Sequence, residues 1–279
     1  MFQAASVLWI YKNKKLLMAR QTSRSKTRSS NKSSAQKEIE EELRQYERDK
    51  VQRKNASLTR ESFQNSTGVR LTDKQNDLFK GIRNNTLTVV HGPAGTSKTF
   101  TSCYTALSLL ADKKIDKIII TKPIQESGEQ LGLLPGTVDE KIDPYKQSYY
   151  TNFCKILDRA TIDWLFSIEE IVFEPLAYMR GSTYDNCIML LDECQNASIK
   201  QLMLWATRLG KDSKAVMMGD TSQYDVKKRD SGYVDFINMT KDMADLYIFE
   251  FQNEDIVRNK FLIELTNRYD KYRSDRPNL

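Results

Sequence analysis

The feature that most constrains the fold is a series of short apolar runs separated by stretches of helical composition. The runs are residues 87–90, 117–121, 171–173, 187–192, 215–220 and 246–251. Most of them lack polar alternation, which is typical of parallel strands covered on both faces. Segments between them, such as 98–110 and 199–209, have helical periodicity. This order predicts an α/β domain with a doubly wound parallel sheet.

A glycine-containing loop follows the first predicted strand and precedes a predicted helix. Its sequence GPAGTSKT fits the phosphate-loop pattern G-x-x-x-x-G-K-[ST], except that a serine replaces the second glycine. The glycines allow backbone N–H groups to turn toward phosphates, and the helix aims its positive dipole end at them. Lys98 supplies a positive charge, and Thr99 is a candidate Mg²⁺ ligand. The candidate nucleotide-binding residues are Gly92, Pro93, Ala94, Gly95, Thr96, Ser97, Lys98, Thr99 and Phe100.

The serine at position 97 is the departure from the pattern. If the backbone there needs a positive φ, the added Cβ costs on the order of 1 kcal/mol. Eight residues also fit a Gly- and Ser-rich loop that binds no nucleotide, so other motifs have to decide between the two interpretations.

Acidic residues follow a later apolar strand. The stretch IMLLDECQN places Asp192 and Glu193 at the strand end. Asp192 is the expected second Mg²⁺ ligand, and Glu193 is the expected base that orients and deprotonates water. The alternative is a helix cap with first-turn charges, which leaves the preceding apolar strand unexplained.

A second strand end carries a candidate sensor of the γ-phosphate. AVMMGDTSQYD delivers Asp220 and Gln223 where the strand stops. Ligands of open α/β sheets bind at the carboxyl ends of strands, so these motifs should meet in one crevice. A glutamine amide there can contact the γ-phosphate or the attacking water, and Gln195 and Gln223 are the candidates.

The positive charge is concentrated at the N-terminus. Residues 1–60 hold 15 Lys and Arg against 6 Asp and Glu, which leaves 28 against 31 for the rest of the chain. We expect residues 1–65 to form a basic extension, with a disordered linker over 21–37 and a solvated helix over 37–54, before a domain over 66–279. The extension is either a salt-sensitive nucleic-acid contact or a solubilising segment.

Composition also bounds the setting of the protein. Four cysteines without a CxxC pair and a single histidine exclude a zinc site and a disulfide framework, so we expect a reducing, cytoplasmic location. The apolar run 4–11 is too short to span a bilayer, and its charges follow it, so neither an export signal nor a membrane segment is predicted.

Five blocks in uninterrupted order resemble the PhoH-like ATPases. They are residues 92–99, 120–145, 174–196, 207–225 and 255–259, within a match from about 71 to 272. The resemblance implies a single RecA-type core related to superfamily 1 helicases, ATP and Mg²⁺ as ligands, and RNA or single-stranded nucleic acid as substrate. It places Gln75 of LTDKQ at the adenine and Arg258 of DIVRN at the γ-phosphate.

The same resemblance has further implications. It makes Lys122 and the loop 129–136 candidate contacts to the nucleic-acid backbone. Cys194 stands where the family has alanine and is expected to be silent, and His91 is expected to be a packing residue.

Superfamily 1 helicases take an arginine from a second RecA-like domain, and only one core is predicted here. We therefore expect the arginine to come from a neighbouring subunit of a homo-oligomer such as a hexameric ring. The candidate arginines are Arg258 first, then Arg229, Arg208 and Arg180, and the alternative for each is a surface ion pair.

These residues favour an ATPase coupled to nucleic acid, with Lys98, Glu193, Gln223 and Arg258 as its catalytic set. The alternative is a nucleotide-binding switch or nucleic-acid-binding module with little or no turnover, for which Glu193 would have no use. A small-molecule kinase is a third reading, and it leaves GDTSQ unexplained.

Overall fold

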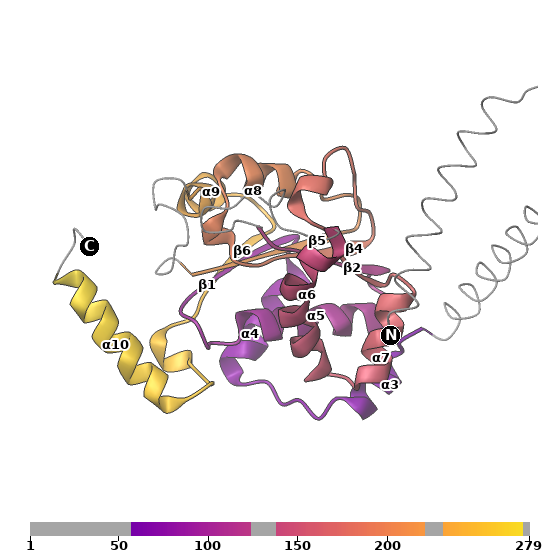
Figure 1. Ribbon diagram of the computed structural model, residues 1–279, viewed down its shortest axis with the longest axis horizontal. Helices are drawn as coiled ribbons and strands as arrows, with labels where there is room; N and C mark the ends of the chain where they lie inside the picture. The colour runs from indigo at the N-terminus through magenta and orange to yellow at the C-terminus, as the bar shows by residue number, and fades with distance from the viewer. Residues whose placement is uncertain (1–56, 124–137, 221–230, 276–279) are drawn as a thin grey trace, which may run out of the picture. The chain divides into compact units, whose positions relative to one another are not determined.

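Six parallel strands form one sheet in the computed structural model (Figure 1). The structure describes residues 57–123, 138–220 and 231–275, all within one compact unit, Lys54–Leu279. The strands are β1 (Leu87–His91), β2 (Lys117–Thr121), β3 (Ile171–Phe173), β4 (Cys187–Leu191), β5 (Lys214–Gly219) and β6 (Leu246–Glu250). Their order across the sheet is β3-β2-β4-β5-β1-β6, and every pair is parallel. Each strand lies within one residue of its predicted position, which confirms the doubly wound α/β fold.

Helices cover both faces of the sheet. The helices are α3 (Arg60–Ser66), α4 (Asp73–Asn84), α5 (Lys98–Ala111), α6 (Val138–Cys154), α7 (Arg159–Ser167), α8 (Ile199–Ala206), α9 (Tyr233–Thr240) and α10 (Lys260–Ser274). Short 3₁₀ turns are η2 (Leu176–Tyr178), η3 (Cys194–Asn196) and η5 (Asn253–Asp255). Helices α3 to α7 pack on one face, and α8 and α9 pack on the other (Figure 1).

The two layers explain why the strands are apolar throughout. Along β2, Ile118 and Ile120 join the core beneath α5, whereas Ile119 joins the core beneath α8 and α9. All three side chains are fully buried. Because successive side chains of a strand point to opposite faces, a strand covered twice cannot alternate with polar residues.

Helix α8 ends three residues earlier than the periodicity suggests. The apolar pattern continues to Leu209, but the helix stops at Ala206. Leu209 instead forms a bridge with Tyr184, so the chain has already turned back toward the sheet by that residue.

The sheet order decides which loops can meet. Strand β5 lies between β1 and β4, and all three run in the same direction. The segments that follow His91, Leu191 and Gly219 therefore leave the same edge of the sheet, as the sequence predicts.

Several predictions concern residues outside the described part of the chain. These are the linker and solvated helix of the N-terminal extension, the loop 129–136, Gln223 and Arg229. The domain boundary between 65 and 66 stays a prediction. Among the described residues, no helix has the length and apolar character needed to cross a membrane.

Candidate nucleotide site

The loop after β1 turns through backbone angles that favour glycine. Gly92 has φ of 142° and Gly95 has φ of 90°. A Cβ on Gly92 would lie 2.5 Å from the carbonyl oxygen of Phe251, which continues from β6. The first position of the loop is therefore restricted to glycine both by its dihedral and by the backbone beside it.

Ser97 occupies the left-handed region, with φ of 69° and ψ of 28°. It is the residue before α5, and its side chain makes no capping hydrogen bond there. Its carbonyl accepts the first helical bond, from the N–H of Thr101 at 2.9 Å. The positive φ considered for this position is therefore what the structure shows, and the serine bears the backbone cost that a glycine would avoid.

Lys98 is folded back onto the loop. Its Nζ donates to the carbonyl oxygens of Gly92 at 2.6 Å and Pro93 at 2.9 Å. Burial lowers the pKa of Lys98, and the nearby carboxylates of Asp220 and Asp192 oppose that shift. A partly buried ammonium whose hydrogen-bond partners are neutral carbonyls can exchange them for phosphate oxygens.

Thr99 and Asp192 meet although 93 residues separate them. The hydroxyl of Thr99 donates to Oδ2 of Asp192 at 3.0 Å. Burial raises the pKa of Asp192, and the adjacent Glu193 raises it further. A partly buried carboxylate beside a hydroxyl offers the oxygen ligands that Mg²⁺ prefers, and a cation would offset the cost of its desolvation. The residues present therefore fit the predicted metal.

This pair would not hold a metal alone. No group of three or more His, Cys, Asp or Glu side chains within the described ranges could bind an ion. Mg²⁺ in proteins of this kind is bound by one or two protein ligands, with water and substrate phosphates filling the rest. The sparse ligand set is therefore typical of a magnesium–nucleotide site.

Glu193 has both carboxylate oxygens engaged. Its Oε1 lies 3.7 Å from Nζ of Lys122, and its Oε2 accepts from Nε2 of Gln195 at 2.7 Å. Gln195 is itself fixed, because its Oε1 accepts the backbone N–H of Asp220 at 3.0 Å. Of the two candidate sensors, Gln195 thus lies beside the predicted base, and Gln223 lies outside the described residues.

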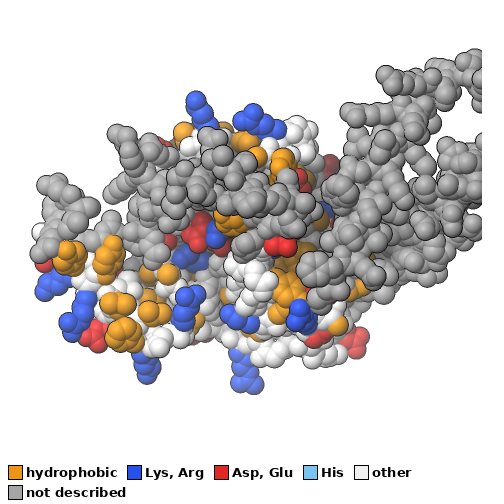
Figure 2. Space-filling model, viewed as in Figure 1, with side chains coloured by type: hydrophobic (Ala, Val, Ile, Leu, Met, Phe, Trp, Pro, Cys, Tyr) orange, Lys and Arg blue, Asp and Glu red, His pale blue; other side chains and the backbone are white. Residues whose placement is uncertain are grey.

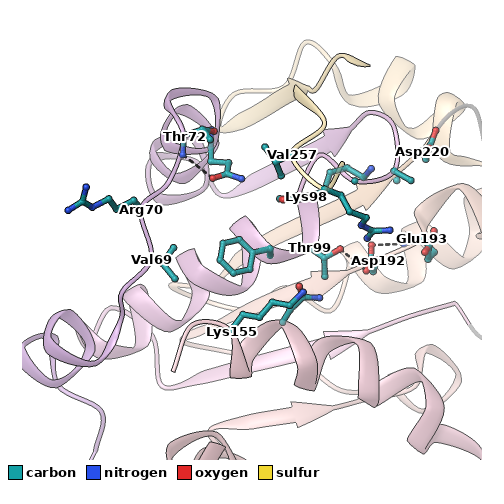
Figure 3. Close-up of a pocket in the computed structure, with 18 residues that line it drawn as sticks. Val69, Arg70, Thr72, Lys98, Thr99, Lys155, Asp192, Glu193, Asp220 and Val257 are labelled. Atoms are coloured by element: carbon teal, nitrogen blue, oxygen red, sulfur yellow. Dashed lines mark hydrogen bonds between the residues drawn. The ribbon is translucent and has the colours of Figure 1, made fainter. Parts of the chain in front are cut away.

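These groups line one pocket of about 610 Å³. Figure 3 shows Thr99, Asp192 and Glu193 together at one end, while Val69 and Arg70 lie at the other. The pocket brings together ten predicted residues: Gln75, Ala94, Gly95, Ser97, Lys98, Thr99, Phe100, Asp192, Glu193 and Arg258. Its volume is in the range of small-molecule sites.

Three predicted residues support the loop without lining the pocket. Gly92 and Pro93 supply the carbonyls that hold Lys98. Thr96 is fully buried, and its hydroxyl donates to the carbonyl of Pro93 at 2.9 Å.

Gln75 lies in the first turn of α4 at the wall of the pocket. Its Oε1 accepts the N–H of Thr72 at 3.0 Å, and its own N–H donates to the Thr72 hydroxyl. Its side-chain amide nitrogen makes no hydrogen bond to another described residue. The capping box fixes the side chain and leaves an N–H₂ group that a nucleobase can accept from.

Arg258 reaches the pocket from its own chain. The N–H of Val257 donates to the carbonyl of Gly95 at 3.1 Å, which fastens this segment to the loop. Within the part of the chain that the structure describes, Arg258 has no hydrogen bond or ion pair. Arg208 donates to the carbonyls of Ser182 and Leu204, away from the pocket, and Arg180 lines a different hollow.

Sequence reasoning missed several lining residues. Val69, Arg70, Asn152 and Lys155 come from segments before α4 and at the end of α6. They belong to no motif, so the sequence carried no signal for them. Asp220, by contrast, stands at the strand end where the sequence placed it.

Two further residues singled out in the sequence, His91 and Cys194, lie outside the pocket. His91 lies 3.9 Å from Glu250, and burial lowers its pKa. Cys194 is fully buried, and its Sγ donates to the carbonyl of Leu191 at 3.3 Å. Burial raises the pKa of its thiol, which fits a small packing residue.

The chain is similar to several known proteins. It is 38% identical over 202 residues to a PhoH-like protein of Mycobacterium tuberculosis (strain ATCC 25618 / H37Rv), covering 72% of this chain and 57% of that protein. It is 38% identical over 199 residues to a PhoH-like protein of Bacillus subtilis (strain 168), covering 71% and 60%. The chain thus spans about three fifths of the length of these relatives.

A solved structure is similar at a greater distance. The Hef helicase domain of Pyrococcus furiosus is 11% identical, with a TM-score of 0.43, over 70% of this chain and 39% of its own length. That likeness is too remote to bear on function. The family description "PhoH-like protein", by contrast, matches residues 69–270, which include the phosphate loop, Asp192, Glu193 and Arg258. The chain therefore belongs to the PhoH-like protein family.

Proposed function

We propose that this protein hydrolyses ATP with Mg²⁺ and couples the hydrolysis to RNA or single-stranded nucleic acid. The observation that carries the ATPase is the hydrogen bond between Thr99 and Asp192, with Lys98 and Glu193 in the same pocket. A phosphate-loop hydroxyl, a partly buried strand-end carboxylate and an adjacent second carboxylate are the parts that nucleotide hydrolysis requires.

Each residue has a distinct role in the proposed reaction. Thr99 and Asp192 hold Mg²⁺, which when bound neutralises charge on the phosphate oxygens. Lys98 leaves the loop carbonyls and binds the β- and γ-phosphates. Glu193 accepts a proton from a water whose oxygen bonds to the γ-phosphorus, while the bond from that phosphorus to the β–γ bridging oxygen breaks and ADP leaves.

The arginine and the base-binding residues complete the site. Arg258 lines the pocket and has no other partner among the described residues, so its guanidinium is available for the charge that develops on the γ-phosphate. Gln75 and Phe100 line the same pocket and provide an amide and a ring for the adenine. Hydrolysis inside one chain then needs no arginine from a neighbour.

Coupling to nucleic acid has two supports. Lys122, the family's expected backbone contact, lies beside Glu193, so a ligand there would contact the catalytic centre. The N-terminal 60 residues carry the excess of positive charge, 15 against 6. We also place the protein in the cytoplasm, where its four free cysteines would stay reduced.

Assembly into a homo-oligomer, such as a hexameric ring, remains part of the proposal. Its support is an apolar stripe on α10, where Phe261 is 67% and Leu265 is 49% exposed. Figure 2 shows hydrophobic side chains on the surface at the lower left, where α10 lies. Large exposed apolar residues at helical spacing are typical of a surface that another protein covers. Light scattering of the wild type and of Phe261→Asp/Leu265→Asp tests it: a monomeric wild type would exclude the oligomer.

Phosphate release tests the ATPase. We expect release by the wild type with Mg²⁺, a loss of at least about 100-fold in Lys98→Ala and Glu193→Gln, and retained ATP binding in Glu193→Gln. Lys241→Ala, an exposed lysine after α9, is the matched control and should behave as the wild type. Each protein is assayed with and without single-stranded RNA. If the wild type binds ATP but releases no phosphate under any condition, the protein is a nucleotide switch.

A further inference from the structure

Both carboxylate oxygens of the predicted base Glu193 have a side-chain partner. Lys122 faces one carboxylate oxygen at 3.7 Å, and Gln195 donates to the other at 2.7 Å. A general base needs an oxygen lone pair within hydrogen-bond reach of the water. Each oxygen keeps a further lone pair, but losing one of the two partners would leave that oxygen free to turn toward the water.

Of the two donors, Lys122 is the one that can move. Gln195 is 2% exposed and is anchored to the backbone of Asp220. Lys122 follows the last residue of β2, its side chain is 22% exposed, and its ammonium has no other hydrogen bond or ion pair with a described residue. A lysine on a flexible stem can leave a partly exposed ion pair at small cost.

The residue before Lys122 connects it to a second surface. The carbonyl of Thr121 accepts the N–H of Asp192 at 3.2 Å. Its hydroxyl donates to Sδ of Met179 at 3.5 Å, and Met179 is fully buried. Thr121 thus contacts both the strand end that carries the acids and the turn that follows η2.

An aromatic ring at the end of η2 and a cation in the turn after it lie on either side of Met179 in the sequence. Tyr178 is 52% exposed. Arg180 is exposed and, among the described residues, makes no hydrogen bond or ion pair. Both line a hollow of about 440 Å³ with Leu176 and Leu204. An exposed ring beside a free guanidinium provides stacking for a base and charge for a phosphate, which is how single strands are bound.

We propose that Lys122 is a positioning residue that holds Glu193 until a single strand binds. The strand places a base on Tyr178 and a phosphate on Arg180, and a neighbouring phosphodiester then attracts the Lys122 ammonium away from Glu193. One carboxylate oxygen of Glu193 then turns to the attacking water. This inference rests on the proposed ATPase and adds to it the site of the single strand and the way in which that strand stimulates hydrolysis.

The test measures kcat and KM for ATP with the full-length protein, with and without a single-stranded oligouridylate. Lys122→Met should raise kcat without RNA by at least about threefold, the scale of a partly exposed ion pair, with KM for ATP unchanged, and it should no longer respond to RNA. Lys122→Arg should restore the response, and Lys241→Met should match the wild type.

The surface at η2 has its own readout. In Tyr178→Ala/Arg180→Ala the oligouridylate concentration for half-maximal stimulation should rise about tenfold or more, because stacking contributes roughly 1–3 kcal/mol per base. Poly-glutamate is assayed in parallel, and stimulation by it but not by RNA would overturn the nucleic-acid assignment in favour of an acidic protein.

The remaining outcomes are separable. If the wild type hydrolyses ATP but Lys122→Met is slower or unchanged, the coupling is wrong and the ATPase stands. If the wild type releases no phosphate at all, both fail. Should Lys122→Met melt below the wild type, Lys122→Gln replaces it, and the same increase in kcat is required.

Discussion

Replacing Ser97 by glycine should stabilise the protein although it removes a side chain. Ser97 sits at φ of 69° without a capping hydrogen bond, so the substitution removes no capping hydrogen bond there. A left-handed backbone costs a residue with a Cβ roughly 1–2 kcal/mol. Glycine in turn gains freedom in the unfolded chain, which costs about 0.4–1 kcal/mol. The difference predicts a net gain of about 0.5–1 kcal/mol.

That gain is small but measurable. For a domain of this size 1 kcal/mol shifts Tm by roughly 2–4 °C, so Ser97→Gly should melt about 2 °C higher than the wild type. Urea midpoints at 25 °C provide the second measurement. Lys113→Gly is the matched control, because Lys113 has φ of 56° and lies at the other end of α5. Lys113 bears the same cost of a left-handed backbone, so we expect a similar increase in Tm for Lys113→Gly.

Comparing the two variants separates the contribution of the Ser97 hydroxyl to stability from the cost of the left-handed backbone. If both shift by the same amount, the serine contributes only its backbone cost. Nucleotide affinity should then be equal or tighter in Ser97→Gly. A loss of stability in Ser97→Gly with a gain in Lys113→Gly, or tenfold weaker ATP binding, would refute the reasoning and assign the hydroxyl a role.

Three further predictions concern the same pocket. Burial raises the pKa of Asp192 in the folded protein above its value in the unfolded chain. The folded state therefore loses stability as pH rises through the folded pKa and the carboxyl ionises. Asp192→Asn cannot ionise, so it should have a higher Tm than the wild type at pH 8, and the difference in Tm should become smaller toward pH 4. A constant margin would contradict this. Gly92→Ala places Cβ 2.5 Å from a backbone oxygen, so urea unfolding should show a loss of about 2 kcal/mol or more, against about 1 kcal/mol for Gly181→Ala, where no atom lies within 4 Å. Gln75→Ala and Gln201→Ala each remove a capping box, so each should lower Tm. Only Gln75→Ala should also reduce the preference for ATP over GTP, measured as the ratio of their KM values. If that ratio is the same in the two variants, Gln75 does not contact the base.

The sequence predicted the sheet well because its strands are covered on both faces. A run such as KIIIT has to bury every side chain, and only a strand between two helix layers does so. The loop, Asp192 and Glu193 could also be placed, since they lie at the ends of such strands. These residues could be expected to meet because the carboxyl ends of parallel strands lie at the same edge of the sheet.

Contacts made by residues outside the motifs could not be predicted. Lys155 and Arg70 reach the pocket through the packing of α6 and the entry to α4, for which no local pattern exists. The contact of Lys122 with Glu193 depends on β2 and β4 being neighbours, a pairing that periodicity alone does not give. The residue roles themselves stay predictions until variants are measured.

The attachment of the C-terminal segment to the phosphate loop has a consequence for where the chain can be cut. Phe251 donates to the carbonyl of His91 at 2.9 Å, and Val257 donates to that of Gly95 at 3.1 Å. The loop is therefore braced from outside by residues more than 150 positions later in the chain. A truncation that ends before Phe251 would remove β6's continuation and leave those two carbonyls without their donors, so the smallest fragment that retains a formed nucleotide loop extends past Val257.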